Sequence, residues 1–494
     1  MRVLLIDPPT NCFTGLVKRG YPIGLCLLAA VAKEEGVEEV CVLDMDWEGP
    51  PLEGLQFLDQ RRNWQRFIDA VNDPDHVVWQ RLRANLSQYH PDVVGITSLT
   101  IQFAAALRVA QIVKEWDPDC LVVLGGPQVS AMPRNTIAWP AVDLAVTGEG
   151  EEVFREILRR RRGGRGDWDD LPGVLAKGQH MPLSPYLEVK NTDGLLPDRH
   201  ALANVPAYGA EDLGLMITSR GCPYSCSFCC NFTRRVRYRS VEDVLAEVAQ
   251  VQAEFGTRQF LFKDDSFTVN HKRVTALCEE ILRRGMVFSW EITTRADLLS
   301  EDLVRLIKRA GCNRVAVGVE SGDDEILKIH EKGLDKEELR SAARLLKHHG
   351  MFWTGYFMMA LPMEREEQIL KTLDFMRELD PAYASIGVYK PYPGTGLFQE
   401  AVDLGLVLPE VDNQHFFERN PVDYFFADPA HRCIHIAPDR LREITRHVAA
   451  AFERHNRQLW NVARRAASRR QLYFRDWGAL RADLRRARKW LVSF

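Results

Sequence analysis

Three cysteines near the middle of the chain lie close enough in sequence to bind one metal centre. Cys222, Cys226 and Cys229 have the spacing C-x3-C-x2-C within the stretch SRGCPYSCSFCC at residues 219–230. Three thiolates at this spacing can ligate three irons of a four-iron cluster, which normally takes four cysteines. The remaining iron would lack a protein ligand, and an open metal position can bind a substrate-like molecule, as it does on a catalytic zinc.

Two other interpretations of these cysteines stand beside the cluster. A zinc site usually pairs two C-x2-C hooks or adds histidines, and no histidine lies near this loop. Free cysteines are also commonly buried as small apolar residues. The three cysteines follow a strand-like run and precede a helical pattern, and this context favours an iron–sulfur cluster. Cys230 lies outside the spacing, and we interpret it as structural or incidental.

Length and composition narrow the class of protein. A chain of 494 residues suggests two to three domains, and its hydrophobic fraction of 46% is ordinary for globular proteins. A net charge of −4 gives no reason to expect nucleic acid as a partner. The opening MRVLLID contains an acid and is not a signal peptide, and no apolar run is long enough for a transmembrane helix. Eleven cysteines without a secretion signal then predict a reducing, cytoplasmic location.

The first third of the sequence alternates apolar strands with helices. Strands are expected at residues 2–7, 39–44, 92–97, 120–125 and 143–147, with helices between them. This alternation indicates a parallel, doubly wound, Rossmann-like α/β sheet. We predict this domain at residues 1–162, with a helical insert at about 47–90. A linker at 163–210, rich in Gly, Pro and Asp, contains a hairpin-like stretch at 173–178.

Polar and glycine-rich turns follow the strands of this predicted sheet. Ligands bind beyond the carboxyl ends of such strands, and glycines there let the backbone approach a large flat or phosphorylated ligand. The alternative is that the glycines only close tight turns, and no G-x-G-x-x-G fingerprint is present. The candidate residues at these ends are Pro9, Thr10, Ser98, Leu99, Thr100, Gly125, Gly126, Pro127, Gln128, Val129, Gly148, Glu149, Gly150 and Glu151.

A second series of strands and helices begins at residue 211. Strands are expected at 213–219, 259–263, 288–293, 314–319, 353–359 and 384–389, each of the first five followed by a helix. Successive βα units form a parallel sheet that curls into a full or partial barrel, with its active site at the carboxyl ends of the strands. We predict this region at 211–430. A C-terminal helical region then covers 431–494.

The cysteine spacing, with an aromatic residue at Phe228 before the third cysteine, resembles the signature of the radical S-adenosylmethionine (SAM) superfamily. The upstream sheet domain, with Gly-Gly-Pro at 125–127 and Gly-Glu-Gly-Glu at 148–151, is similar to the cobalamin-binding domain of the cobalamin-dependent (class B) radical SAM methylases. The resemblance covers roughly residues 1–430. It implies a (β/α)6 partial TIM barrel and a [4Fe–4S] cluster ligated by Cys222, Cys226 and Cys229, the catalytic cysteines, with SAM on the open iron.

The resemblance also implies where the two organic cofactors bind. Cobalamin is expected at the strand-end residues of the first domain. The chain has no D-x-H-x-x-G string, and Gln128 stands where family members often have histidine, so we expect cobalamin base-off and without a histidine ligand. The residues expected to bind SAM are Phe228, Asp264, Asp265, Ser266, Arg295, Glu320, Ser321, Gly355 and Leu361.

Some of these SAM assignments also have a physical rationale. The adjacent carboxylates of Asp264 and Asp265 can accept hydrogen bonds from an ammonium group, although capping of the next helix is an alternative role. Glu320 and Ser321 suit the ribose hydroxyls or the region of the SAM carboxylate, and Arg295 supplies a cation. The stretch around Gly355 and Leu361 matches the adenine-contact pattern G-x-I-x-G-x-x-E only loosely. Tyr392, in a Pro-Gly turn, is a candidate substrate contact or a packing residue.

The function implied by the resemblance is methyl transfer to an unactivated carbon of a small natural-product, tetrapyrrole or lipid-type substrate, by way of a 5′-deoxyadenosyl radical and methylcobalamin. A radical cyclisation, ring rearrangement or oxidation without net methylation uses the same cofactors. A methylthiotransferase fits less well, because Cys12, Cys26 and Cys41 are too close together for its second cluster. A cobalamin- or redox-sensing binding protein is the alternative outside enzymes.

Two kinds of partner are expected besides the small-molecule substrate. The chemistry needs an external one-electron donor such as a ferredoxin or flavodoxin. The C-terminal region interleaves arginines with aromatic residues, for example at Trp460, Arg464 and Arg465. This pattern suggests peripheral contact with a membrane or an anionic substrate, or else the solvated basic face of helices packed on the barrel.

Overall fold

The computed structural model describes residues 1–14, 20–46, 60–178, 185–230, 233–468 and 470. The chain forms two compact units. The first contains Met1–Leu213, Phe228–Phe232 and Lys390–His431, and the second contains Gly214–Ser227, Thr233–Tyr389 and Arg432–Phe494. Each unit has a six-stranded sheet of its own, and each is described by itself below.

The sheet of the first unit has the strand order β2-β1-β3-β4-β5-β6. Its strands are β1 (Arg2–Asp7), β2 (Glu39–Asp44), β3 (Val93–Thr97), β4 (Leu121–Gly125), β5 (Leu144–Val146) and β6 (Val174–Ala176). The first five are parallel, and β6 adds antiparallel to β5. Strand order reverses between β1 and β3, which is where ligands of doubly wound sheets bind. The predicted doubly wound sheet is confirmed.

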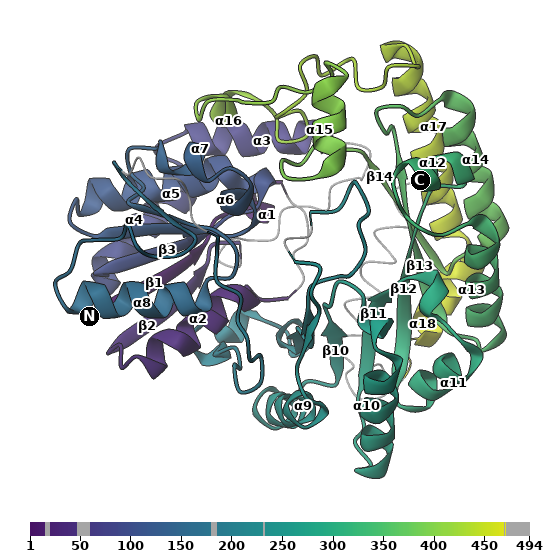
Figure 1. Ribbon diagram of the computed structural model, residues 1–494, viewed down its shortest axis with the longest axis horizontal. Coiled ribbons are helices and arrows are strands. Elements are labelled where there is room, and N and C mark those ends of the chain that lie inside the picture. The colour runs from purple at the N-terminus through teal and green to yellow at the C-terminus, as the bar shows by residue number, and fades with distance from the viewer. Residues whose placement is uncertain (15–19, 47–59, 179–184, 231–232, 469, 471–494) are drawn as a thin grey trace. The chain divides into compact units, whose positions relative to one another are not determined.

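Helices cover both faces of this sheet (Figure 1). The helices α2 (Ile23–Glu34) and α8 (Glu151–Arg162) pack together, as do α4 (Val77–Tyr89) and α5 (Phe103–Trp116). Further helices of the unit are α1 (Asn11–Thr14), α3 (Gln60–Asn72), α6 (Pro127–Ala131) and α7 (Pro133–Ile137). The predicted helical insert therefore includes α3 and α4, and its residues 47–59 lie outside the described part of the chain.

Two segments that the sequence assigned elsewhere group with the first unit. The predicted linker packs onto this sheet through β6 and through Tyr208, whose hydroxyl donates to Asp44 Oδ2 at 2.8 Å. Residues 390–431, which contain α15 (Gly396–Asp403) and α16 (His415–Glu418), also belong to this unit. In α16, the Phe416 ring centroid lies 4.9 Å from that of Phe103. Aromatic packing thus ties this late segment to the early sheet.

The second unit contains a parallel sheet in the order β14-β13-β12-β11-β10-β7. Its strands are β7 (Leu215–Met216), β10 (Gln259–Phe262), β11 (Ser289–Thr294), β12 (Cys312–Glu320), β13 (Phe352–Met359) and β14 (Tyr383–Val388). The helices are α9 (Val241–Phe255), α10 (His271–Arg283), α11 (Glu301–Arg309), α12 (Asp324–Ile329), α13 (Lys336–His348) and α14 (Glu366–Leu379). These six strands confirm the predicted βα series, and Figure 1 shows α10, α11, α13 and α14 along the outer side of the sheet.

The core of the second unit lies between this sheet and its helices. In β10 and β11 every second residue faces the helices and is buried, as Phe260, Phe262, Trp290 and Ile292 are. The intervening residues face the inner side of the curled sheet and are more exposed. This period of two separates a packing face from a face that is available to ligands.

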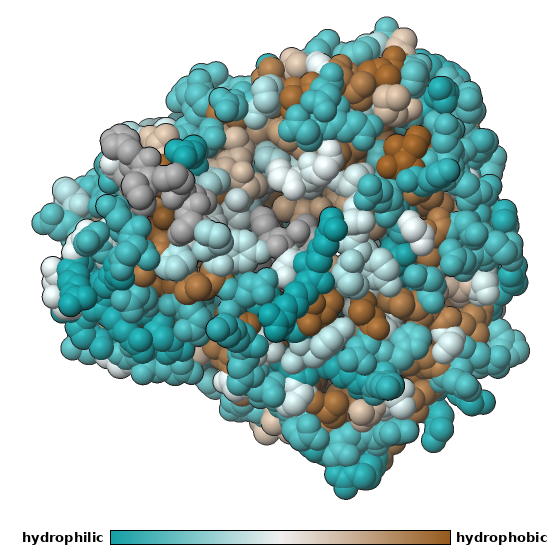
Figure 2. Space-filling view, in the orientation of Figure 1, coloured by the Kyte–Doolittle hydropathy of each residue, from teal (hydrophilic) through white to brown (hydrophobic). Residues whose placement is uncertain are grey.

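The C-terminal region forms α17 (Pro438–Arg457) and α18 (Leu459–Ser468), and residues 469 and 471–494 lie outside the described part of the chain. Asn456 in α17 bonds to both backbone groups of Ala384 on β14, with Ala384 N–H donating at 2.8 Å and the Asn456 amide donating at 2.7 Å. Within the described residues no helix is both long and apolar enough to cross a membrane. On the face drawn in Figure 2, hydrophilic side chains predominate and hydrophobic ones form small groups.

Candidate functional site

The cluster loop, residues 221–230, begins at a short antiparallel pair of strands. β8 (Ser219–Arg220) pairs with β9 (Arg237–Tyr238), and the Cys222 N–H donates to the Thr233 carbonyl at 3.3 Å. Gly221 has a φ of 92°, and a Cβ there would lie 2.6 Å from the Arg235 carbonyl oxygen. The turn before the first cysteine therefore requires glycine.

The three cysteines of the motif form no disulfide within the described residues. Cys222 and Cys226 are partly exposed and belong to the second unit, whereas Cys229 is exposed and belongs, with Phe228, to the first. Burial raises the pKa of the Cys222 thiol, and a hydrogen bond from the Tyr224 backbone opposes this. Because the thiolate is the metal ligand, a positively charged iron must offset the cost of burying that charge.

Asp264 organises the segment that enters the cluster loop. Its buried carboxylate accepts hydrogen bonds from Thr218 N at 2.7 Å, Thr218 Oγ1 at 2.6 Å and Ser219 Oγ at 2.7 Å. The helix that follows, α10, is capped by Asn270 instead. Asp264 is thus committed to holding the chain ahead of the cysteines and does not cap the next helix.

Asp265, next in sequence, is exposed and is the more available carboxylate of the two. Neighbouring protein atoms remove part of the water around its carboxyl group and so raise its pKa, the charge of Asp264 raises it further, and a hydrogen bond from the Gly221 backbone opposes both. An ammonium group placed here would relieve the repulsion between the two carboxylates. Beside it, Ser266 Oγ is buried and has no hydrogen-bond partner among the described residues. This orphaned hydroxyl fits the presence of a polar ligand.

Arg295, which directly follows β11, contacts the cluster loop. Its guanidinium carbon lies 3.7 Å from the centroid of the Tyr224 ring, a cation–π contact. The same guanidinium donates to Lys332 O at 2.7 Å and Gly333 O at 3.2 Å, and its Nε contacts Asp297 at 3.1 Å. The Arg295 guanidinium is therefore already engaged in contacts within the protein. Its predicted role in binding SAM stays a prediction.

Glu320 ends β12 in a strained conformation and pairs with a cation. Its φ is 66°, and its Oε1 lies 2.9 Å from Lys332 Nζ. Lys332 is buried, and a Cβ at Gly318 would clash with Glu320 Oε1. Non-glycine residues with positive φ often mark functional sites. The arrangement presents a fixed carboxylate–ammonium pair at the inner edge of the sheet.

The other predicted SAM residues are packed more deeply. Ser321 is buried, and its hydroxyl contacts Thr372 Oγ1 at 3.2 Å. Gly355 sits where a Cβ would lie 2.7 Å from the Phe357 ring, and Leu361 N–H donates to Glu364 Oε2 at 3.1 Å. Their contribution to SAM binding would come from shape and backbone rather than from free side-chain groups.

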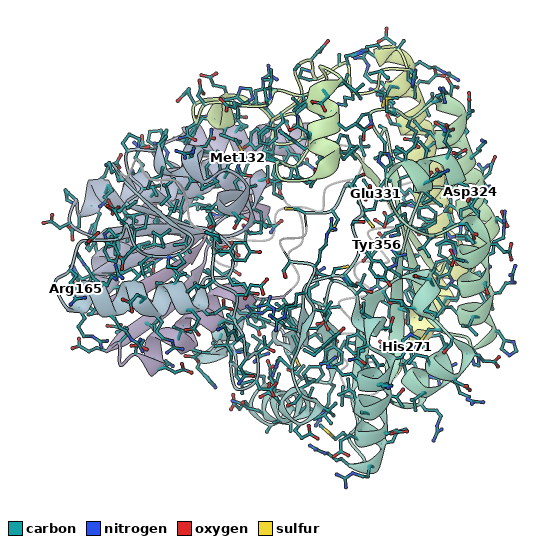
Figure 3. The ribbon with its side chains drawn as sticks, in the orientation of Figure 1. Met132, Arg165, His271, Asp324, Glu331 and Tyr356 are labelled. Atoms are coloured by element: carbon teal, nitrogen blue, oxygen red, sulfur yellow. The ribbon has the colours of Figure 1, made fainter. Side chains whose placement is uncertain are left out.

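Sequence reasoning missed three residues that the structure brings to this site. Lys332 pairs with Glu320, and His330 contacts Ser227 in the cluster loop. Tyr356, in the middle of β13, is 41% exposed and lies on the side of the sheet away from α13 and α14 (Figure 3). Tyr356 lies in the strand predicted at 353–359, where the period of two puts it on the face opposite Phe357, so the sequence could have identified it, whereas the other two depend on contacts between distant segments.

The candidate residues of the first unit meet at the carboxyl ends of β3 and β4. Ser98 N–H donates to Gly125 O at 2.9 Å, and Gln128 N–H donates to Ser98 O at 3.1 Å. The Thr100 hydroxyl donates to Gln128 Oε1 at 2.7 Å, and the Gln128 amide contacts Met132 Sδ at 3.2 Å. The buried Gln128 side chain is therefore fully engaged within the protein.

At each of these strand ends a glycine allows another part of the chain to lie close to its backbone. At Gly126, with a φ of 102°, a Cβ would lie 2.9 Å from Ser98 N and O. At Gly148 a Cβ would clash with the Tyr186 ring, and Glu149 Oε2 accepts from Val189 N–H at 2.6 Å. The turn at 148–149 thus packs against the segment that contains Tyr186 and Val189. Tight packing is therefore one role of Gly148.

Other features at this edge fit a large ligand with apolar and polar parts. Leu99 is 48% exposed, and the buried Thr10 Oγ1 has no hydrogen-bond partner among the described residues. These two residues lie at the topological switch point, where doubly wound sheets bind their ligands, and the orphaned hydroxyl fits a polar group of such a ligand. The remaining predicted residues lie in the same turns: Pro9 after β1, Pro127 and Val129 in α6, and Gly150 and Glu151 at the start of α8.

Two further residues of the first unit were singled out by sequence. Tyr392 is 37% exposed, and its carbonyl accepts from Thr395, the residue that caps α15. Its contact with substrate stays a prediction. Cys230 is exposed, and its sulfur lies 3.9 Å from where a Cβ at Gly394 would stand.

Two family models match the chain. The Radical SAM superfamily matches residues 216–376, and the B12 binding domain matches residues 16–158. These matches confirm the three predicted cofactors, which are a [4Fe–4S] cluster, SAM and cobalamin.

Relatives with known or assigned activities extend the comparison. An uncharacterised methyltransferase of Pyrococcus horikoshii is 30% identical over 470 residues, which are 92% of each chain. The anaerobic magnesium-protoporphyrin IX monomethyl ester cyclase of Cereibacter sphaeroides is 30% identical over 361 residues, 68% of this chain and 57% of that protein.

Among solved structures, the radical SAM methyltransferase TsrM from Kitasatospora setae, with tryptophan and a SAM analogue bound, has the same fold. Its TM-score is 0.68 at 19% sequence identity, covering 91% of this chain and 89% of that one. The full-length similarity to the Pyrococcus protein and the paired domain matches together establish that the chain belongs to the cobalamin-dependent radical SAM methyltransferases.

Proposed function

We propose that this protein transfers a methyl group to an unactivated carbon of a small-molecule substrate. The observation that carries the proposal is the cluster loop itself, in which three cysteines follow a glycine turn, with Asp264 holding the chain ahead of the turn and Arg295 packing on Tyr224 after it. When bound, the cluster supplies the electron that cleaves SAM, and cobalamin carries the methyl group.

Particular side chains divide the work of binding. Cys222, Cys226 and Cys229 hold the cluster, and Asp265 accepts hydrogen bonds from the SAM ammonium group. The Glu320–Lys332 pair offers a carboxylate to hydroxyls and an ammonium to a carboxylate. The strand-end residues of the first unit, with Leu99 and Thr10 foremost, hold cobalamin. The inner face of the barrel, including Tyr356, binds substrate and excludes water.

The electron must come from outside the chain. Cys229 is exposed, and an exposed ligand gives an external one-electron donor a short path to the cluster. We propose a ferredoxin or flavodoxin in this role. Cytoplasmic residence follows from the same requirement, because such donors and a reduced cluster need a reducing compartment.

A radical cyclisation without net methyl transfer is the second candidate. Its support is the similarity to the magnesium-protoporphyrin cyclase, which reaches 30% identity over 68% of this chain. The same residues would bind the same cofactors, so the products distinguish the two reactions. Methyl transfer yields S-adenosylhomocysteine together with 5′-deoxyadenosine, whereas the cyclisation yields 5′-deoxyadenosine alone.

The test begins with the full chain reconstituted anaerobically with iron, sulfide and hydroxocobalamin. We expect absorbance bands from both cofactors and, with SAM and dithionite, both nucleoside products. A protein that binds both cofactors and forms neither product would instead be a sensing protein, and the proposal would fail.

The roles of the two adjacent carboxylates give a sharper arm of this test. Asp265→Asn is expected to weaken SAM binding about tenfold, since a hydrogen bond to a charged group contributes about 1.5–3 kcal/mol, and to leave iron content unchanged. Asp264→Asn should lower iron content, because it disturbs the chain ahead of Cys222. Equal effects of the two variants on both measurements would contradict the assignment.

A further inference from the structure

Three side chains that can bind a metal ion meet between α11 and α13, two helices of the second unit that contact each other. Glu301 is the first residue of α11, His348 is the last residue of α13, and His349 caps that helix. One carboxylate oxygen and one nitrogen of each imidazole lie within 4.8 Å of one another. Among the residues that the structure describes, this is the only such group.

The distance between His349 and Glu301 suits a shared ion. His349 Nε2 lies 3.8 Å from Glu301 Oε1, which is too long for a hydrogen bond. Two ligand atoms on one tetrahedral zinc ion, with bonds of about 2.0–2.2 Å, stand about 3.3–3.6 Å apart. The observed separation is therefore close to that of two ligands of the same ion.

The His349 nitrogen that faces Glu301 is also a nitrogen that the protein leaves unpaired. Nε2 is buried and makes no hydrogen bond within the described part of the chain. Buried polar atoms almost always have a partner, so this nitrogen fits a ligand that the chain does not supply. Arg305, four residues after Glu301 in α11, pairs with Asp302 at 2.6 Å. The Glu301 carboxylate is therefore not neutralised by this neighbouring cation.

The two helices hold these ligands at one place. The rings of His348 and His349 meet edge to face with their centroids 5.1 Å apart, so both imidazoles reach the same small region. Lys308, which is seven residues after Glu301 and hence on the same face of α11, donates from Nζ to the His349 carbonyl. This bond joins the backbone of one ligand to the helix that carries another. Rotation of the exposed Glu301 and His348 side chains can close the remaining gap of about 1 Å.

The donor atoms determine which ion fits. Two imidazole nitrogens and one carboxylate oxygen form a ligand set that zinc takes in proteins, with water in the fourth position. Calcium and magnesium prefer sites made of oxygen atoms. Because Glu301 and His348 are exposed, water can reach the fourth position.

We propose that Glu301, His348 and His349 bind a zinc ion that clamps α11 to α13. This site is separate from the cysteine motif and does not depend on the proposed methyl transfer. In the unfolded chain Glu301 is no longer held beside the two histidines, so zinc binds the folded chain more tightly. Binding of this kind stabilises the fold.

The experiment uses the full chain with its cluster reconstituted, so that iron occupies the motif cysteines. Isothermal titration with zinc chloride gives affinity and stoichiometry, and X-ray absorption at the zinc edge identifies the ligand atoms. Melting temperature is recorded with and without zinc. His349→Gln and Glu301→Gln each remove one ligand. The matched control is His447→Gln, which changes an exposed histidine of α17 outside this group.

We expect one zinc ion per chain, bound by nitrogen and oxygen only, and a higher melting temperature with zinc. Each ligand variant should bind zinc at least about a hundredfold more weakly, since loss of a group that only supports a ligand already costs about 10–100-fold. The control should match the wild type.

Sulfur among the zinc ligands, or wild-type zinc affinity in His349→Gln and Glu301→Gln, overturns the proposal. So does zinc that binds without raising the melting temperature, because it would not clamp the helices. If His349→Gln does not fold, Glu301→Gln still decides, because it changes an exposed side chain.

Discussion

Both units contain a parallel sheet whose carboxyl edge carries the candidate residues. The two edges differ in the residue types that occupy their left-handed backbone positions. In the first unit the left-handed positions at strand ends are glycines, Gly126 and Gly148. In the second they are Glu320, with a φ of 66°, and Ala360, with a φ of 61°. The first edge therefore lets backbone and other chain segments approach closely, whereas the second keeps side chains at the cost of strain.

The polar groups at the two edges differ in the same way. At the first edge Ser98, Thr100 and Gln128 bond to one another or to backbone. The second edge carries charged groups, the exposed Asp265 and the paired Glu320 and Lys332. A large ligand contacted by backbone suits the first edge, and a small zwitterion suits the second.

The largest expected effect is loss of the cluster. Cys226→Ala should abolish iron binding and 5′-deoxyadenosine formation, because three irons cannot be held by two thiolates at this site. Hydroxocobalamin binding should persist, since it depends on the other edge. Iron assay, product analysis and cobalamin absorbance provide the measurements. Cys230→Ala is the control and should keep its iron; loss of iron in both variants would contradict the assignment of ligands.

The next effect concerns the backbone approach at the first edge. Gly126→Ala places a Cβ 2.9 Å from Ser98 N and O, so we expect a loss of about 1–3 kcal/mol in the free energy of unfolding together with weaker cobalamin binding. Gly36→Ala shares the positive φ but meets no atom within 4 Å, so it should cost less and leave cobalamin binding intact. Calorimetry and absorbance titration test this pair, and equal effects would show that φ alone matters.

A buried carboxyl group behind β13 makes the stability of the second unit depend on pH. Burial raises the pKa of Glu364 from 4.5 to about 8. The folded chain therefore holds a proton that the unfolded chain releases between these values. Stability should fall as pH rises through that window, by at most about 1.4 kcal/mol per pH unit.

Glu364→Gln removes this titrating group. Melting temperatures between pH 5 and pH 9 should thus decline less steeply in the variant than in the wild type. Glu242→Gln, at an exposed position on α9, should keep the wild-type slope. Parallel curves for the wild type and Glu364→Gln would show that this carboxyl group does not govern the pH dependence.

The smallest effect is expected at the strained end of β13. Ala360→Gly relieves a left-handed conformation that costs about 1–2 kcal/mol for a non-glycine residue, and glycine loses about 0.5–1 kcal/mol of that gain to chain entropy. We expect a stabilisation of up to about 1 kcal/mol in chemical denaturation. A destabilised variant would mean that the alanine methyl group contributes packing that outweighs the strain.

The fold was largely predictable because apolar runs such as residues 2–7 and 120–125 are too short for helices and recur between helical patterns. The cluster loop was predictable because its chemistry depends on spacing along the chain. The role of Asp264 was not, since its partners Thr218 and Ser219 are more than 40 residues away and polar contacts of that kind leave no periodic signal. The grouping of residues 390–431 with the first unit depends likewise on Phe416 meeting Phe103.

The side-chain amide of Asn456 protects the unpaired edge of the sheet in the second unit. Among the described strands β14 pairs on one side only, so its other side offers a template on which a foreign strand could grow. By satisfying both main-chain groups of Ala384, a single side chain substitutes for the missing neighbour and interrupts that template. This edge of the sheet is thereby protected from association with the edge strands of other polypeptides.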